Sequence, residues 1–180
     1  MNTLQIGLAA WIIQDGNYDD FAVNQEAKFA LEFCPHSLSP AQPGTPRLDS
    51  IGPARYSIHG HVDFVDSKAW VVDFGLRAFH EAACPPGILP QSWVQGEVYL
   101  GIDPFFYFER LYDLPGMPEL SYKWVIKHIK LETTPWITTG RFSARDESKT
   151  SFKDIQKTDA WHDDGGRAHY TLECECLGPC

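Results

Sequence analysis

The sequence contains no apolar run long enough to cross a membrane. Its longest runs, such as Leu8–Ile13, fall far below the ~20 residues that a membrane-spanning helix requires. The amino-terminal stretch MNTLQIGLAAWIIQDG also lacks the basic start and the small-residue cleavage site of a secretory signal. From these absences we expect a cytoplasmic protein with no membrane partner.

Basic residues are scarce relative to acidic ones. The chain has 15 Lys and Arg residues against 24 Asp and Glu residues, which gives a net charge of −9. A nucleic-acid binder gains much of its affinity by replacing counterions with basic side chains, so a surface of this charge repels a phosphate backbone. We therefore expect no nucleic-acid partner, whereas a basic protein would be attracted.

Cysteine is present in an odd number, which does not suit a disulfide framework in a chain without an export signal. In RAHYTLECECL, Cys174 and Cys176 alternate in line with Tyr170 and Leu172, which is typical of small core residues. A cysteine zinc site would also need a second ligand pair, and the sequence does not supply one. The five cysteines are Cys34, Cys84, Cys174, Cys176 and Cys180.

Familiar catalytic templates are missing as well. The sequence has neither a glycine-rich phosphate loop nor a serine in a nucleophile-elbow context. Asp163 and Asp164 directly precede Gly165, which is typical of turn chemistry rather than of an acid–base pair. The catalytic residues of any reaction therefore stay unassigned.

What the sequence does contain is apolar alternation with a period of two. Hydrophobic residues make up 43% of the 180 residues, an ordinary globular balance. In several segments every second residue is β-branched, aromatic or otherwise apolar, which predicts half-buried strands. The predicted buried faces are Ala27, Phe29, Leu31 and Phe33; Tyr56, Ile58, Val62 and Phe64; Val94, Val98, Leu100 and Ile102; and Ala168, Tyr170, Leu172, Cys174 and Cys176.

Two segments are harder to interpret. Within 120–132, Tyr122, Val125, Ile126 and Ile129 recur at helical spacing, but the β-branched content and the following Thr-Thr-Pro favour a strand. The stretch FFYFERLY, at 105–112, has aromatic side chains at consecutive positions. We expect it to be a strand that is buried on both faces.

Proline and glycine divide the chain without suggesting an interdomain linker, because strands of similar character flank every break. The segment 34–53 is expected to be a long irregular loop rich in proline. The segment 161–177 is expected to be a C-terminal hairpin that turns at Asp164-Gly165 or Gly165-Gly166. We predict a single all-β domain over residues 1–180, with antiparallel strands closed into a β-barrel or paired as a β-sandwich.

One predicted strand, YSIHGHVDF, carries a candidate metal site. His59, His61 and Asp63 share its polar face, because strand residues two apart point the same way at a spacing of roughly 6.6 Å. Two imidazoles and a carboxylate can bind Zn or Fe in this arrangement. The same side chains also suit the solvent side of an ordinary strand. A further ligand would be needed, and the sequence selects none among His80, His128, His162 and His169.

This strand resembles the first motif of cupins, in which His-x-His on a barrel strand is followed by an acid. The matching residues here are His59, His61 and Asp66. The resemblance implies a small metal-dependent β-barrel enzyme. Two departures weaken it: cupins have Glu rather than Asp at the third position, and LPGMPELSYKW does not supply their second motif.

Two hypotheses about function follow. The first is a non-catalytic acidic β-domain, with no cofactor, that binds a protein partner through aromatic and carboxylate side chains. A basic partner, and a role as an inhibitor of the immunity type, would fit this hypothesis. The alternative is a cupin-like metal-dependent enzyme that uses His59 and His61 with Zn or Fe. The charge balance and the absence of a complete catalytic set favour binding.

Overall fold

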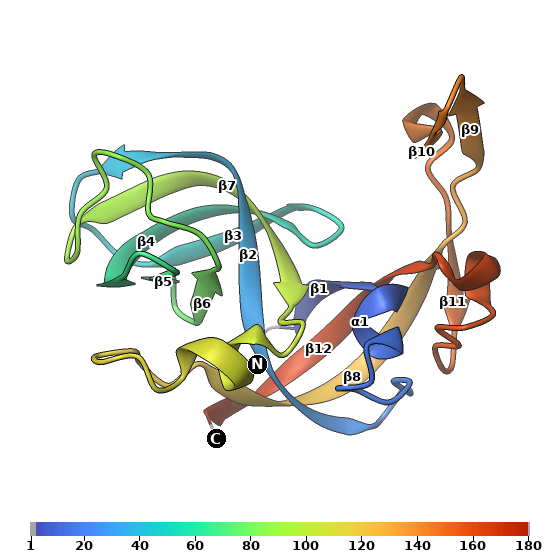
Figure 1. Ribbon diagram of the computed structural model, residues 1–180, viewed down its shortest axis with the longest axis horizontal. Helices are drawn as coiled ribbons and strands as arrows, with labels where there is room; N and C mark the ends of the chain where they lie inside the picture. Colours follow the sequence, from blue (N-terminus) through green and yellow to red (C-terminus); the bar gives the residue numbers. More distant parts are fainter. Residues whose placement is uncertain (1–2, 180) are drawn as a thin grey trace.

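The computed structural model describes residues 3–179 and is predominantly β (Figure 1). One short α-helix, α1 (Ala10–Gln14), follows the first strand. The strands are β1 (Thr3–Ala9), β2 (Glu26–Ala41), β3 (Arg47–Gly52), β4 (Arg55–Val65), β5 (Trp70–Asp73), β6 (Arg77–His80), β7 (Trp93–Ile102), β8 (Ser121–Glu132), β9 (Trp136–Thr139), β10 (Phe142–Arg145), β11 (Phe152–Ile155) and β12 (His169–Pro179). The remaining helical turns are η1 (Tyr107–Leu111), η2 (Glu147–Lys149) and η3 (Asp163–Gly166).

Ten strands form one large sheet in the order β11-β8-β12-β1-β7-β2-β6-β5-β4-β3, and β9 and β10 form a separate hairpin. Most neighbours are antiparallel, as predicted. Two contacts are parallel, however: Gly7 on β1 with Gly101 on β7, and Glu32 on β2 with Phe79 on β6. The sheet is therefore mixed, and the prediction of antiparallel strands alone is corrected.

Two additional pairings, β8 with β2 and β7 with β4, close the strands into two circuits. We call β1, β12, β8 and the first part of β2 the β8 lobe, and β4, β5, β6, β7 and the rest of β2 the β4 lobe. Each circuit is closed on one side by a single parallel residue pair. Neither lobe is thus the complete barrel that the alternation suggested, because a barrel wall needs a continuous ladder.

Strand β2 connects the two lobes, because different parts of it belong to each. It has 16 residues and is about 50 Å long at the usual rise per residue. Its first five residues pair with β8, and the remainder pairs with β7. In Figure 1 it runs from the β4 lobe down into the β8 lobe.

The predicted buried faces are confirmed, except that Ala27 and Cys176, at the ends of two of these faces, are only partly buried. One apolar core runs through both lobes and contains Phe29, Phe33, Val62, Leu100 and Leu172 among others, and Cys174 is fully buried within it. A second, smaller core lies beneath the segment that connects β7 to β8 and includes Phe64, Phe79 and Leu111.

Segment 120–132 is a strand, as we favoured, and a bulge explains its helix-like spacing. Along β8 the partners on β12 shift between Glu173 and Cys174, so that His128 and Ile126 face consecutive residues of β12. An extra residue in one strand changes which side chains face the core. Ile126 and Ile129 are both buried although they are three positions apart.

Segment 105–112 is helical, and the prediction of a strand is wrong. The Asp103 carboxylate accepts backbone hydrogen bonds from Phe106 (2.8 Å) and Tyr107 (3.1 Å), which satisfies donors that the first helical turn leaves free. Tyr107 and Leu111, four residues apart, point into the smaller core. Aromatic content alone could not distinguish these two arrangements.

Most of the expected loop at 34–53 is strand, because β2 continues to Ala41 and β3 starts at Arg47. Only residues 42–46 are irregular. Beyond Glu32, β2 pairs only with β7 among the described residues. Pro35 and Pro40 are tolerated because proline is compatible with the free edge of a strand.

The expected hairpin at 161–177 is also corrected. Residues 163–166 do form a tight turn, and Asp164 and Gly165 have positive φ angles of 48° and 64°. Strand β12, however, begins only at His169 and pairs with β1 and β8 rather than with the segment before the turn. Long-range pairing thus replaces the local hairpin.

The β9–β10 hairpin extends away from the two lobes (Figure 1). At its base the guanidinium groups of Arg145 and Arg167 both lie over the ring of Trp136, at 4.1 Å and 4.7 Å from its centroid. The indole N–H of Trp136 and Arg145 both donate to Asp164, each at 2.8 Å. Among residues 3–179, no helix has the length and apolar character needed to cross a membrane.

Candidate functional site

His59 lies on the predicted polar face of β4, but both of its ring nitrogens already face backbone carbonyl oxygens. Nδ1 is 3.0 Å from the oxygen of Thr45, and Nε2 is 3.0 Å from the oxygen of Gln42. The ring also stacks on Trp93, at 5.0 Å between centroids. These contacts fix segment 42–46 against β4 and leave neither nitrogen free to bind a metal ion.

His61 and Asp63 are likewise engaged with each other. His61 Nδ1 is 2.6 Å from one oxygen of Asp63, and Arg77 Nε donates to the other at 2.8 Å. Asp66, the acid of the cupin resemblance, accepts the backbone N–H of Lys68. Within the described part of the chain, no three His, Cys, Asp or Glu side chains are close enough to hold one ion. The geometry therefore gives the metal hypothesis no support.

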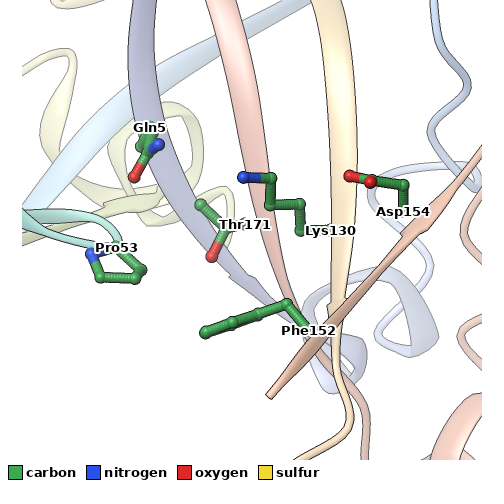
Figure 2. A pocket seen from close by; sticks show the side chains of 6 residues that line it. All are labelled: Gln5, Pro53, Lys130, Phe152, Asp154 and Thr171. Atoms are coloured by element: carbon green, nitrogen blue, oxygen red, sulfur yellow. The ribbon is translucent and has the colours of Figure 1, made fainter. Parts of the chain in front are cut away.

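A concave site lies elsewhere, between the two lobes. The turn between β3 and β4 faces the outer surface of β1, β12, β8 and β11, and Figure 2 shows Pro53 on this turn opposite side chains from all four strands. We call this depression the interlobe groove. It is lined by Gln5, Pro53, Tyr99, Lys130, Glu132, Phe152, Asp154, His169, Tyr170 and Thr171.

The alternation of β1, β8 and β12 explains the polar floor of the groove. Gln5 and Thr171 point outward between the buried neighbours of their strands. Lys130 and Asp154 are directly opposite each other on β8 and β11. Neither forms an ion pair with any residue from 3 to 179. The floor therefore offers a free charge of each sign to a ligand.

Tyr99 and Phe152 supply the aromatic walls. The ring of Phe152 extends from β11 toward Pro53 (Figure 2), and 38% of its surface is exposed. Tyr99 lies so close to Gly7 that a β-carbon on Gly7 would overlap the phenol ring. Burial, with smaller contributions from Cys34 and Glu132, raises the pKa of Tyr99 to about 12. The phenol thus stays protonated near neutral pH and can donate a hydrogen bond.

One tyrosine also fixes the separation of the lobes. The hydroxyl group of Tyr56, on β4, accepts the backbone N–H of Gln5 at 2.7 Å and donates to the carbonyl oxygen of Gln5 at 3.0 Å. Gln5 belongs to β1, on the other side of the groove. The groove is therefore already formed before any ligand binds, which reduces the cost of binding.

Next to the groove lies a cleft of about 430 Å³, the Glu32 cleft. It shares Tyr99 and His169 with the interlobe groove. Burial and the neighbouring charge of Glu81 raise the pKa of Glu32 to about 7. The other lining residues are Gly7, Ala9, Trp11, Ile12, Cys34, Gly101, Ile102 and Pro104.

Two carboxyl groups at or next to the cleft, the half-buried Glu32 and the buried Asp103, predict that stability depends on pH. Burial raises the pKa of Asp103 from 3.8 to about 7, and that of Glu32 rises from 4.5 to about 7. Between pH 4.5 and 7 the unfolded chain releases these protons while the folded chain keeps them. The free energy of unfolding should therefore fall as the pH rises through this window, by up to about 1.4 kcal/mol per pH unit for each group.

Urea denaturation at pH 5 and pH 7 measures this dependence. In Glu32→Gln the loss of stability between the two pH values should be smaller than in the wild type. Glu97→Gln makes the same charge change at an exposed ion pair with Arg55. This variant should lose as much stability between pH 5 and pH 7 as the wild type does. An equal loss in all three proteins would show that Glu32 does not take up a proton on folding.

Comparison with protein-family models, with curated proteins and with solved structures gives no significant match.

Reasoning from the sequence missed this site and directed attention to His59, His61 and Asp63 instead. Tyr99 and Glu32 do occupy polar positions in their alternating strands, which was a signal that they face outward. Their proximity results from the pairing of β2 with β7, in which Glu32 faces Gly101 and Cys34 faces Tyr99. That long-range pairing is not visible in local periodicity.

Proposed function

We propose that this chain is a non-catalytic binding protein that holds an extended segment of a protein partner in the interlobe groove. The observation that carries the proposal is the preformed groove itself, with aromatic walls from Tyr99 and Phe152 and unpaired charges on its floor. Buried aromatic anchors surrounded by polar side chains are where protein interfaces concentrate their binding energy.

The state of the reactive groups supports binding rather than catalysis. Burial and the charge of Glu32 raise the pKa of the Cys34 thiol, so the thiolate that would act as a nucleophile is disfavoured. Tyr99 stays protonated for a similar reason. Side chains in these states contribute hydrogen bonds and contact area to a bound segment.

The overall charge supports a basic partner. A net charge of −9 accelerates association with a positively charged protein and disfavours acidic ones. An inhibitor of the immunity type, which blocks a basic protein by binding it, is consistent with this charge and with a rigid groove.

Site-specific cross-linking tests this proposal. A photoreactive phenylalanine analogue at position 152 should form one defined adduct with a partner protein in native extract. The same analogue at position 142, on the β9–β10 hairpin, is the matched control, because Phe142 is 80% exposed and lies outside the groove. Adducts at 142 but not at 152, or at neither position, would contradict the proposal.

A further inference from the structure

The Glu32 cleft contains a carboxylate without a counterion. Glu32 forms neither a hydrogen bond through its side chain nor an ion pair with any described residue from 3 to 179, and no lysine or arginine lines the cleft. The nearby Glu81, in contrast, is paired with Arg110 at 3.0 Å. A half-buried carboxylate without a partner is costly, and a cation from outside would offset that cost.

The side chains around Glu32 also suit a cation with an aliphatic stem. Trp11, which is 49% exposed, and Tyr99 both line the cleft. Ile12, Ile102 and Pro104 add apolar surface. Aromatic faces attract ammonium and guanidinium groups, and apolar walls cover the methylene groups that carry them.

We propose that the Glu32 cleft is a subsite for the cationic end of a lysine or arginine side chain of the bound segment, with Glu32 as its counterion and Trp11 and Tyr99 as aromatic walls. This inference rests on the proposed function and adds the chemistry of one partner residue. The other ionisable groups near Glu32 are Cys34 on β2, Glu81 after β6, Tyr99 on β7, Asp103 after β7 and His169 on β12.

Small cations that reproduce the side-chain ends test the subsite without the partner. Butylammonium and propylguanidinium are added to the labelled protein at pH 8, where Glu32 is mostly ionised, and amide and indole N–H shifts are followed by NMR. We expect saturable shifts centred on Trp11, Cys34 and Gly101, with a millimolar dissociation constant for at least one cation. The tighter of the two identifies the preferred side chain.

Two controls separate the role of the charge from that of the apolar walls. Neutral 1-butanol, and butylammonium added to Glu32→Gln, should each bind at least about tenfold more weakly, as expected for the loss of a charge-assisted contact. Glu97→Gln should bind the cations as the wild type does. Equal binding by Glu32→Gln and the wild type, equal binding of butanol, or no saturable shift would each overturn the subsite. A failed titration with intact cross-linking at position 152 would refute only the subsite and leave the proposed function standing.

Discussion

Replacing Trp124 with alanine is expected to lower the free energy of unfolding by about 3–5 kcal/mol. The side chain is fully buried and stacks on Phe29 at 5.3 Å between centroids. Its indole N–H donates to the carbonyl oxygen of Phe29 at 3.2 Å. Trp124 thus connects β8 to β2, and its loss removes both a large apolar volume and a buried hydrogen bond.

The measurement is equilibrium unfolding in urea. Trp161→Ala is the control, because the Trp161 side chain is 64% exposed and its truncation should change stability by less than about 0.5 kcal/mol. A loss of less than about 1 kcal/mol in Trp124→Ala would show that the β8 lobe is not held together by this contact.

The second large effect is expected at Gly96, where β7 approaches β2 through backbone atoms. A β-carbon there would lie 1.7 Å from the carbonyl oxygen of Ser37, and the φ angle of Gly96 is +144°, which side chains rarely allow. Alanine must therefore push the two strands apart and strain the backbone. We expect Gly96→Ala to lower the free energy of unfolding by about 2–5 kcal/mol.

Gly101 offers a matched control in the same strand. A β-carbon on Gly101 would have its nearest neighbour at 3.6 Å, an ordinary contact distance. Gly101→Ala should therefore unfold at nearly the wild-type urea concentration. Equal stability of the two alanine variants would show that β7 does not approach β2 as closely at Gly96 as the structure indicates.

The strands themselves could be predicted because the alternation of buried and outward-facing side chains is visible within each strand's own sequence. In β4, Tyr56, Ile58 and Val62 are buried while His59 and His61 are half-buried on the opposite face. A strand that is covered on one side needs this alternation, whatever its neighbours are. For this reason β4, β7 and β12 were recognised with the correct faces.

The errors arose where distant contacts decide the conformation. Segment 105–112 forms a helical turn because Asp103 caps it, and aromatic composition does not reveal a cap. Residues 34–41 form a strand despite two prolines because β7 pairs with them on one side. The bulge in β8 produced helical spacing within a strand.

The candidate site was hidden for the same reason. Gln5, Pro53, Phe152 and Thr171 lie on four different elements. Gln5, Thr171 and Phe152 meet because β12 pairs with both β1 and β8 and because β11 pairs with β8, and Pro53 faces them from the turn between β3 and β4. His59 and His61, in contrast, are only two positions apart in the sequence, so local inspection finds them. The ring contacts of His59 hold segment 42–46 against β4, and His61 contacts Asp63 of the same strand.

The affinity of the cross-linked partner for two alanine variants tests the central claim most directly. Phe152→Ala removes an aromatic wall of the interlobe groove, and Phe142→Ala removes an equal volume from the exposed hairpin. With the purified partner, we expect Phe152→Ala to raise the dissociation constant by about tenfold or more and Phe142→Ala to leave it within about twofold. If Phe142→Ala weakened binding and Phe152→Ala did not, the partner would bind outside the groove.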